Sequence, residues 1–253
     1  MRINILLTLI TLLINTQVYA FDFKNFDWFD TSVGFALNPR TNIRTNDILV
    51  NNANLFYTNS DPIYEPIPIL FFRFANIFIN KDGGGIAFAH FPHFKLRALI
   101  TVDGEGFKAP GMEERKNSWF AGGLLQYYLI QIKYLRDINS VSNGQNFRID
   151  LFREKHFGKL QFEPHIGIQV WDRKYTNYYY GVKASEATSK RPQYHTKETL
   201  NYTFELRYIY TDGPRKYILI PMYKKYSREV NSSLFVVRDE EFRLTFGIVW
   251  KLF

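Results

Sequence analysis

Apolar and polar residues alternate along the last segment of the chain. Every even position from Phe242 to Leu252 is apolar, whereas the odd positions include Arg243 and Lys251. A period of two is typical of a β-strand with two unlike faces. The pattern therefore predicts a strand over 240–252 that has one apolar and one polar face.

The same alternation recurs in four other segments, and their charges fall on the polar parity. In a soluble sandwich the apolar face would meet a core, whereas in a membrane barrel it meets lipid and the polar face lines the interior. Segments of about ten residues match a tilted membrane crossing, which favours the barrel. Aromatic residues near the segment ends predict an interfacial girdle. The segments are 94–103, 128–135, 159–170 and 199–210, and the girdle residues are Trp171, Tyr210, Tyr223 and Trp250.

Alternation and turn residues together predict an all-β fold, a single closed antiparallel transmembrane β-barrel of about ten strands. The sheet has to close because lipid offers its backbone no hydrogen-bond partners. His90-Phe91-Pro92-His93 interrupts the third segment as a bulge or a turn, so twelve strands is the alternative. The predicted strands are 28–38, 65–80, 85–103, 117–125, 127–137, 145–155, 159–171, 198–210, 215–228 and 240–252.

The connections between these strands sort into two groups by length. Short ones at 81–84, 156–158 and 211–214 carry tight-turn residues and are expected on the periplasmic side, with both chain ends. The longer connections are expected on the extracellular side. They are 39–64, 104–116, 172–197 and 229–239.

The N-terminus has the features of a secretory signal peptide. Arg2 supplies the positive charge, 6–13 form a short apolar core, and Val18-Tyr19-Ala20 resembles a cleavage site. The apolar run is too short for a spanning helix of about 20 residues. We therefore expect a signal peptide at 1–20 and a barrel domain at 21–253 in the outer membrane of a Gram-negative cell.

Composition narrows the partners and the chemistry. The formal charge of +8 includes Arg2 of the signal peptide, which leaves +7 for the mature chain. Outer-membrane lipid and the phosphates of lipopolysaccharide, or peptidoglycan carboxylates, are the expected counterparts, and an exported protein is not expected to bind nucleic acid. Cysteine is absent, which excludes disulfides and thiolate metal sites. We expect no metal and no cofactor.

Only one segment resembles a catalytic motif, and it is incomplete. Outer-membrane lipases and deacylases use a His-x-Ser-Asn motif in which the histidine activates the serine. Here Ser142-Asn143-Gly144 is preceded by Ser140 where the histidine would stand. Asn143-Gly144 is typical of a hairpin turn instead. We therefore expect no enzyme, and a lipid-modifying activity is the disfavoured alternative.

Several charged side chains are expected to face the barrel interior. They predict an ion network in the lumen, and their bulk would fill much of a narrow barrel, so we expect little conductance. The alternative is a small porin-like channel. The predicted network comprises Lys95, Arg97, Glu163, Glu205, Arg207 and Arg243.

Several motifs in order resemble the outer-membrane family that contains MipA, the MltA-interacting protein, and OmpV. Tyr64-Glu65-Pro66-Ile67-Pro68 is similar to an early Tyr-x-Pro-x-Pro, and Arg115-Lys116-Asn117-Ser118 to a central Arg-Lys-Ser. The chain departs from the family pattern at Ser233 in place of Pro, and at Arg191-Pro192 in place of Ser-Gly. The loop motif that carries most of the resemblance comprises Tyr179, Tyr180, Gly181, Val182, Glu186 and Tyr194.

The resemblance implies an outer-membrane barrel whose loop motif is structural or binds a partner. In the family's namesake it implies a scaffold that joins a murein transglycosylase to a penicillin-binding protein, and other members are surface antigens or stress-related proteins. The scaffold would use the small periplasmic surface of 81–82, 156–158 and 212–215. Its expected aromatic anchors are Phe21, Phe23, Phe26 and Phe157.

Overall fold

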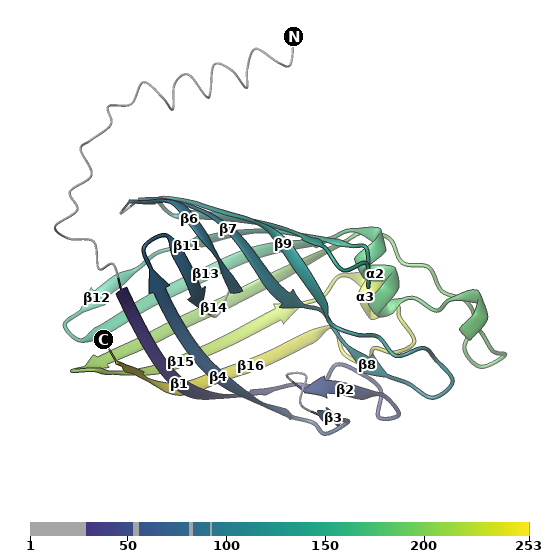
Figure 1. Ribbon diagram of the computed structural model, residues 1–253. Helices are drawn as coiled ribbons and strands as arrows, with labels where there is room; N and C mark the ends of the chain where they lie inside the picture. Colours follow the sequence, from purple (N-terminus) through teal and green to yellow (C-terminus); the bar gives the residue numbers. More distant parts are fainter. Residues whose placement is uncertain (1–28, 53–55, 81–82, 92, 253) are drawn as a thin grey trace, which may run out of the picture.

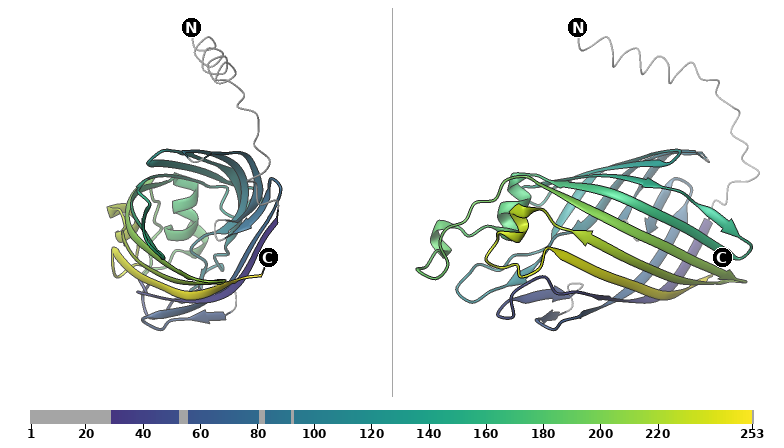
Figure 2. Two further views of the ribbon diagram at one scale, coloured as in Figure 1. Left: turned by 90° about the vertical axis from the view of Figure 1, so that its left-hand side faces the viewer. Right: turned by 180° about the vertical axis from the view of Figure 1, so that it is seen from behind.

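The strands of the protein form one barrel, which is a ring around a helix in the end-on view and is elongated in the side views (Figures 1 and 2). The computed structural model describes residues 29–52, 56–80, 83–91 and 93–252. The predicted signal peptide at 1–20, the aromatic residues between 21 and 26, and Phe253 lie outside the described residues. The barrel domain is therefore seen from Phe29 onward.

The sheet is antiparallel throughout and closes on itself. β1 pairs with β16, and β11 pairs with β13, which completes the ring. β11 and β12 follow each other along β13 and occupy one position, so the described wall has 12 strands. The wall strands are β1 (Phe29–Arg40), β4 (Ile63–Phe74), β5 (Ile77–Asn80), β6 (Gly83–Phe91), β7 (Phe94–Asp103), β9 (Ser118–Tyr127), β10 (Ile130–Asp137), β11 (Gln145–Phe152), β12 (Lys155–Phe157), β13 (Leu160–Trp171), β14 (Thr199–Asp212), β15 (Arg215–Lys225) and β16 (Glu240–Lys251).

The alternation along each strand separates a lipid face from a lumen face. On β13 the outward Ile166 is 60% exposed, whereas its neighbour His165, which points inward, is 3% exposed. On β16 Phe242 points outward and the buried Glu241 points inward. Apolar side chains thus cover the outside and polar ones line the inside, as a membrane barrel requires. The prediction of a closed transmembrane barrel is confirmed.

The prediction of ten strands is wrong, and the twelve-strand alternative is confirmed. The segment predicted as 65–80 turns at Ala75 and Asn76 between β4 and β5, and Ala75 has φ of 50°. Asn76 is the only polar residue in this turn, and apolar residues flank the turn on both sides, so the sequence gives only a weak turn signal. The segment predicted as 85–103 is divided into β6, which ends at Phe91, and β7, which begins at Phe94, with a turn at His93.

Because of these additional turns, the connection at 81–84 lies on another side than predicted. β5 starts at the periplasmic turn after β4 and runs away from it, so its last residue, Asn80, does not face the periplasm. The prediction that 81–84 is a periplasmic turn is therefore wrong, and Lys81 and Asp82 lie outside the described residues. The turns that follow Phe157 and Asp212 lie at the same end as the C-terminus (Figure 1).

β4 borders a notch in the barrel wall. It pairs with β1 over its whole length, but with β5 only at Phe72–Phe74. Among the described residues, no strand of the barrel pairs with the other edge of β4 between Ile63 and Phe71. Pro66 and Pro68 lie in this stretch, and a proline lacks the N–H that a second neighbour would require. The motif Tyr-Glu-Pro-Ile-Pro therefore marks an edge of the wall.

The opposite end of the barrel carries the longer connections (Figure 1). Two of them form a small sheet from β2 (Leu49–Asn52), β3 (Phe56–Thr58) and β8 (Phe107–Lys108). The others contain α2 (Arg173–Tyr180), the 3-10 turn η2 (Ala184–Glu186) and α3 (Arg228–Asn231). In the part of the chain that the structure describes, none of the helices has the length and apolar character needed to cross a bilayer.

Candidate functional site

Helix α2 folds inward and lies across the extracellular end of the lumen (Figure 2). It begins after Asp172, whose side chain accepts the N–H of Tyr175 at 2.9 Å, as an N-cap does. It ends at Gly181, whose N–H donates to the carbonyl of Asn177. The buried residues Tyr175, Thr176, Tyr179 and Tyr180 share one face of the helix and point into the barrel.

The buried face of α2 packs on aromatic side chains of the wall. Trp171 stacks on Tyr175 at 4.8 Å between ring centroids and on Tyr180 at 5.9 Å. Phe120 contacts Tyr175 from β9 at 6.0 Å. Burial raises the pKa of the Tyr175 and Tyr180 hydroxyls above their ordinary value, so both stay neutral. We call this group the aromatic plug; it comprises Phe120, Trp171, Tyr175, Tyr179, Tyr180 and Tyr226.

A buried ion pair holds the loops above the plug together. Arg115 donates to Glu186 through Nη1 at 2.8 Å and through Nη2 at 2.6 Å, and it is fully buried. Its Nε donates to the carbonyl of Tyr178 at 2.7 Å. Glu186 also accepts the backbone N–H groups of Glu113 and Lys183. Burial alone would raise the pKa of the Glu186 carboxyl, but these hydrogen bonds hold it below its usual value.

The rest of the loop motif joins the same group. Val182 and Tyr194 exchange backbone hydrogen bonds at 2.9 and 3.2 Å, and Tyr194 donates its hydroxyl to the carbonyl of Glu229 at 2.9 Å. A Cβ on Gly181 would lie 2.6 Å from the carbonyl of Asn177, so the chain needs glycine at this position. The structure thus brings all six predicted motif residues together, inside or directly above the plug.

The predicted lumen charges divide into separate groups. Arg207 contacts Glu163 at 3.6 Å and also pairs with Glu205, while His165 lies 3.1 Å from Glu163. Arg243 instead pairs with Glu241 at 2.6 Å on its own strand. Lys95 and Arg97 lie on β7, where the Arg97 guanidinium lies 5.1 Å from the centre of the Phe78 ring.

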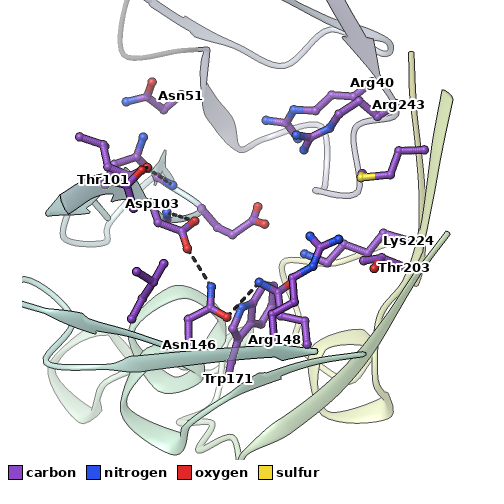
Figure 3. Close-up of a pocket in the computed structure, with 18 of the residues that line it drawn as sticks. Arg40, Asn51, Thr101, Asp103, Asn146, Arg148, Trp171, Thr203, Lys224 and Arg243 are labelled. Carbon is purple, nitrogen blue, oxygen red and sulfur yellow. Dashed lines mark hydrogen bonds between the residues drawn. The ribbon is translucent and has the colours of Figure 1, made fainter. Parts of the chain in front are cut away.

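A polar cavity of about 410 Å³ lies in the lumen beside the plug (Figure 3). Five cationic and three acidic side chains line it, a balance of +2. Three of the cations already have carboxylate partners: Arg40 with Glu65 at 2.7 Å, Arg148 with Asp150 at 2.6 Å, and Arg243 with Glu241. The charged lining residues are Arg40, Lys133, Arg148, Lys224, Arg243, Glu65, Asp103 and Glu105. We call it the luminal cavity.

Sequence reasoning missed most of this cavity. Trp171 was predicted to lie in the interfacial girdle, but it is 1% exposed and points inward. Trp171 stands at an odd position of β13, as the lumen-facing residues of this strand do. This parity is the sequence signal that could have placed it in the lumen. Lys224 lies at the end of the predicted apolar strand 215–228, and nothing in its neighbours marked it as part of a site.

Ser142 and the close histidine pair His90 and His93 lie in structural surroundings. The hydroxyl of Ser142 donates to Asp137 at 2.8 Å, and the same carboxylate oxygen accepts the backbone N–H of Ser142 and of Asn143. His93 stacks on Tyr128 at 4.8 Å in a turn, while His90 lies on β6. Among the described residues, no group of three metal-binding side chains is close enough to hold an ion.

Comparison with known proteins identifies the family. The family profile of the MltA-interacting protein MipA matches residues 52–252, which is most of the chain. The chain belongs to the MipA family. The barrel and the names of its relatives place the protein in the Gram-negative outer membrane. The resemblance read from the sequence motifs is therefore confirmed.

Relatives of this MipA-family chain are outer-membrane proteins. OmpV of Vibrio cholerae is 30% identical over 150 residues, 54% of this chain and 58% of that protein. The 24 kDa outer membrane protein of Pasteurella multocida is 25% identical over 211 residues, 74% of this chain and 82% of that protein. The matched segment spans 63% of the length of YiaT of Escherichia coli. The outer membrane channel DcaP of Acinetobacter baumannii is 10% identical, with 88% of this chain and 96% of that chain covered and a TM-score of 0.36.

Proposed function

We propose that the protein is a non-enzymatic scaffold that holds a murein transglycosylase, and through it a penicillin-binding protein, at the outer membrane. The observation that carries the proposal is the difference between the two ends of the barrel. The extracellular end is filled by the aromatic plug and its ion pair, whereas the periplasmic end presents short turns with exposed apolar side chains. The family description, an MltA-interacting protein, supports the same role.

The periplasmic turns offer a compact surface for a partner. Phe157 is 61% exposed, Leu129 is 53% exposed and Tyr128 is 54% exposed. Tyr128 stacks on His93 at 4.8 Å between ring centroids, so two neighbouring turns contact each other on this surface. Exposed aromatic side chains are favoured at the hot spots of interfaces. Phe157 is the only predicted anchor within the described residues, and 81–82 lie outside them.

Affinity capture from detergent-solubilised envelopes, with the full-length protein as bait, tests the scaffold. We expect a murein transglycosylase to be recovered, and its recovery to be lost with Leu129→Ser and Phe157→Ser combined. Val237→Ser is the matched control, because Val237 is an equally exposed apolar residue (57%) in an extracellular loop. Repeated capture without any murein enzyme, or equal capture by the periplasmic variant, would contradict the proposal.

A channel is the second candidate, because the luminal cavity shows that the barrel interior is not completely filled. The packed plug above this cavity favours the scaffold, and we expect little conductance from the purified protein in planar bilayers. Stable channels that admit sugars would favour the channel instead.

A further inference from the structure

Three buried donors that line the luminal cavity have no acceptor among the described residues. The Nζ of Lys224, a residue that is 8% exposed, contacts ring faces only, at 4.2 Å from Trp171 and 4.5 Å from Tyr226. Trp171 Nε1 and Thr203 Oγ1 are also buried without a hydrogen-bond partner. A buried donor without an acceptor is unfavourable, so a group of three such donors indicates a site for an acceptor from outside the chain.

The facing wall of the cavity is acidic. Asp103 lies across from Lys224 and Thr203 (Figure 3). It accepts hydrogen bonds from Asn146 at 2.9 Å and from the backbone N–H of Gly104, two of the roughly four that a carboxylate can accept. Glu105 lines the same cavity and has no hydrogen bond or ion pair within the described part of the chain. This wall can therefore accept further donors.

Most of the other cations of the cavity are already neutralised, and Lys133, half-buried on β10, is the exception. Arg40, Arg148 and Arg243 each form a close pair with a carboxylate, so they extend the basic wall without offering a free charge. The buried unpaired donors thus lie on β13, β14 and β15, and the free acceptors lie across from them at the end of β7. A simple anion would meet Asp103 and Glu105, and a simple cation would meet Lys224.

We infer that the luminal cavity binds a small zwitterion of about the size of a dipeptide. Its carboxylate would accept hydrogen bonds from Lys224, Trp171 and Thr203, and its ammonium group would donate to Asp103 and Glu105. The volume of about 410 Å³ lies in the range of pockets for small ligands. The inference does not depend on the scaffold, since the cavity and the periplasmic turns are separate surfaces.

Tryptophan fluorescence of the detergent-solubilised protein tests this site. Trp28, Trp119 and Trp250 are replaced by Phe, so that Trp171 is the single reporter. Glycylglycine is the zwitterionic probe, and acetate and methylammonium carry only one of its charges each. We expect a saturable change with glycylglycine and binding at least about tenfold weaker for each single-charge probe.

Variants assign the two ends of the ligand. Lys224→Met and Glu105→Gln are each expected to weaken glycylglycine binding by about tenfold or more, and Thr203→Val by several-fold. Lys216→Met is the matched control, since it removes the same charge from β15 outside the cavity. Thr203→Val keeps the side-chain shape, so it tests the site even where the charge variants fail to fold.

Three results would overturn the inference. They are the absence of a saturable response to glycylglycine, acetate binding as tight as that of glycylglycine and insensitive to Glu105→Gln, and equal effects of Lys216→Met and Lys224→Met. Heat-modifiable migration on a gel verifies that each variant is a folded barrel.

Discussion

Two buried cations near the extracellular end of the lumen differ in the hydrogen bonds that their side chains make. Arg115, between the loops of the plug, donates to both oxygens of Glu186 and to the carbonyls of Tyr178 and Glu113. Lys224, in the wall of the luminal cavity, has aromatic faces around its ammonium group and no acceptor among the described residues. Both side chains are removed from water, so the difference lies in their partners and not in their burial.

The comparison separates a structural charge from a charge that is available to a ligand. A buried charge with all its hydrogen bonds made is costly to disturb, because its partner would be left unpaired. Removal of Lys224 leaves no hydrogen-bond acceptor unpaired, because Glu241, directly across from it on β16, keeps its bonds from Arg243 and Tyr226. The loop motif of the family thus closes the extracellular end of the barrel. The luminal cavity, in contrast, has unpaired donors that a ligand could bind.

The largest effect is expected for Arg115→Ala. This change leaves the Glu186 carboxylate buried without its cation, which costs about 3–5 kcal/mol for buried pairs of this kind. Loops 104–117 and 172–198 should then detach and become sensitive to protease, while the barrel wall persists. Limited proteolysis combined with heat-modifiable gel migration measures both parts separately.

A double variant sharpens this prediction. Arg115→Met together with Glu186→Met replaces the pair by apolar side chains of similar volume, and such replacements are often neutral. We expect it to recover more than half of the lost protease resistance. A double variant as sensitive as Arg115→Ala would show that the pair does not act through its charges.

An intermediate effect is expected from acid. The pKa of Glu186 is lowered in the folded protein, so the ion pair contributes stability above the unfolded carboxyl value of about 4.3 and loses it as the pH falls through the folded pKa. Protease sensitivity of loop 172–198 should therefore rise below about pH 4. The double Met variant should lack this component, and an identical pH profile for both proteins would refute the assignment to Glu186.

The smallest effect is expected for Lys224→Met. Its cation–π contacts are worth about 0.5–2 kcal/mol, and removal of a buried charge offsets a similar amount, so we expect a net change below about 1 kcal/mol. Denaturant unfolding followed by Trp171 fluorescence measures this change. A loss as large as that of Arg115→Ala would mean that Lys224 has a structural role like that of Arg115, and the comparison would fail.

The alternation of apolar and polar residues was sufficient to predict a closed membrane barrel, but not the side of every connection, since 81–84 was wrongly expected in the periplasm. The barrel follows because lipid excludes charge from one parity of every strand and leaves no backbone group unpaired. The number of strands could not be predicted from this alternation. Asn76 is the only turn-forming residue at this point, and Phe74, Ile77 and Phe78 beside it are apolar, so the segment resembles one continuous strand.

The partners of the functional residues were decided by the tertiary structure alone. Motif order placed Arg115 and Glu186 in two loops, but nothing in the sequence paired them across 71 positions. The luminal cavity likewise draws its free groups from β7, β13, β14 and β15, which face one another only because the ring closes between β11 and β13. Alternation determines which side of the wall a side chain occupies, and closure of the barrel determines what it meets there.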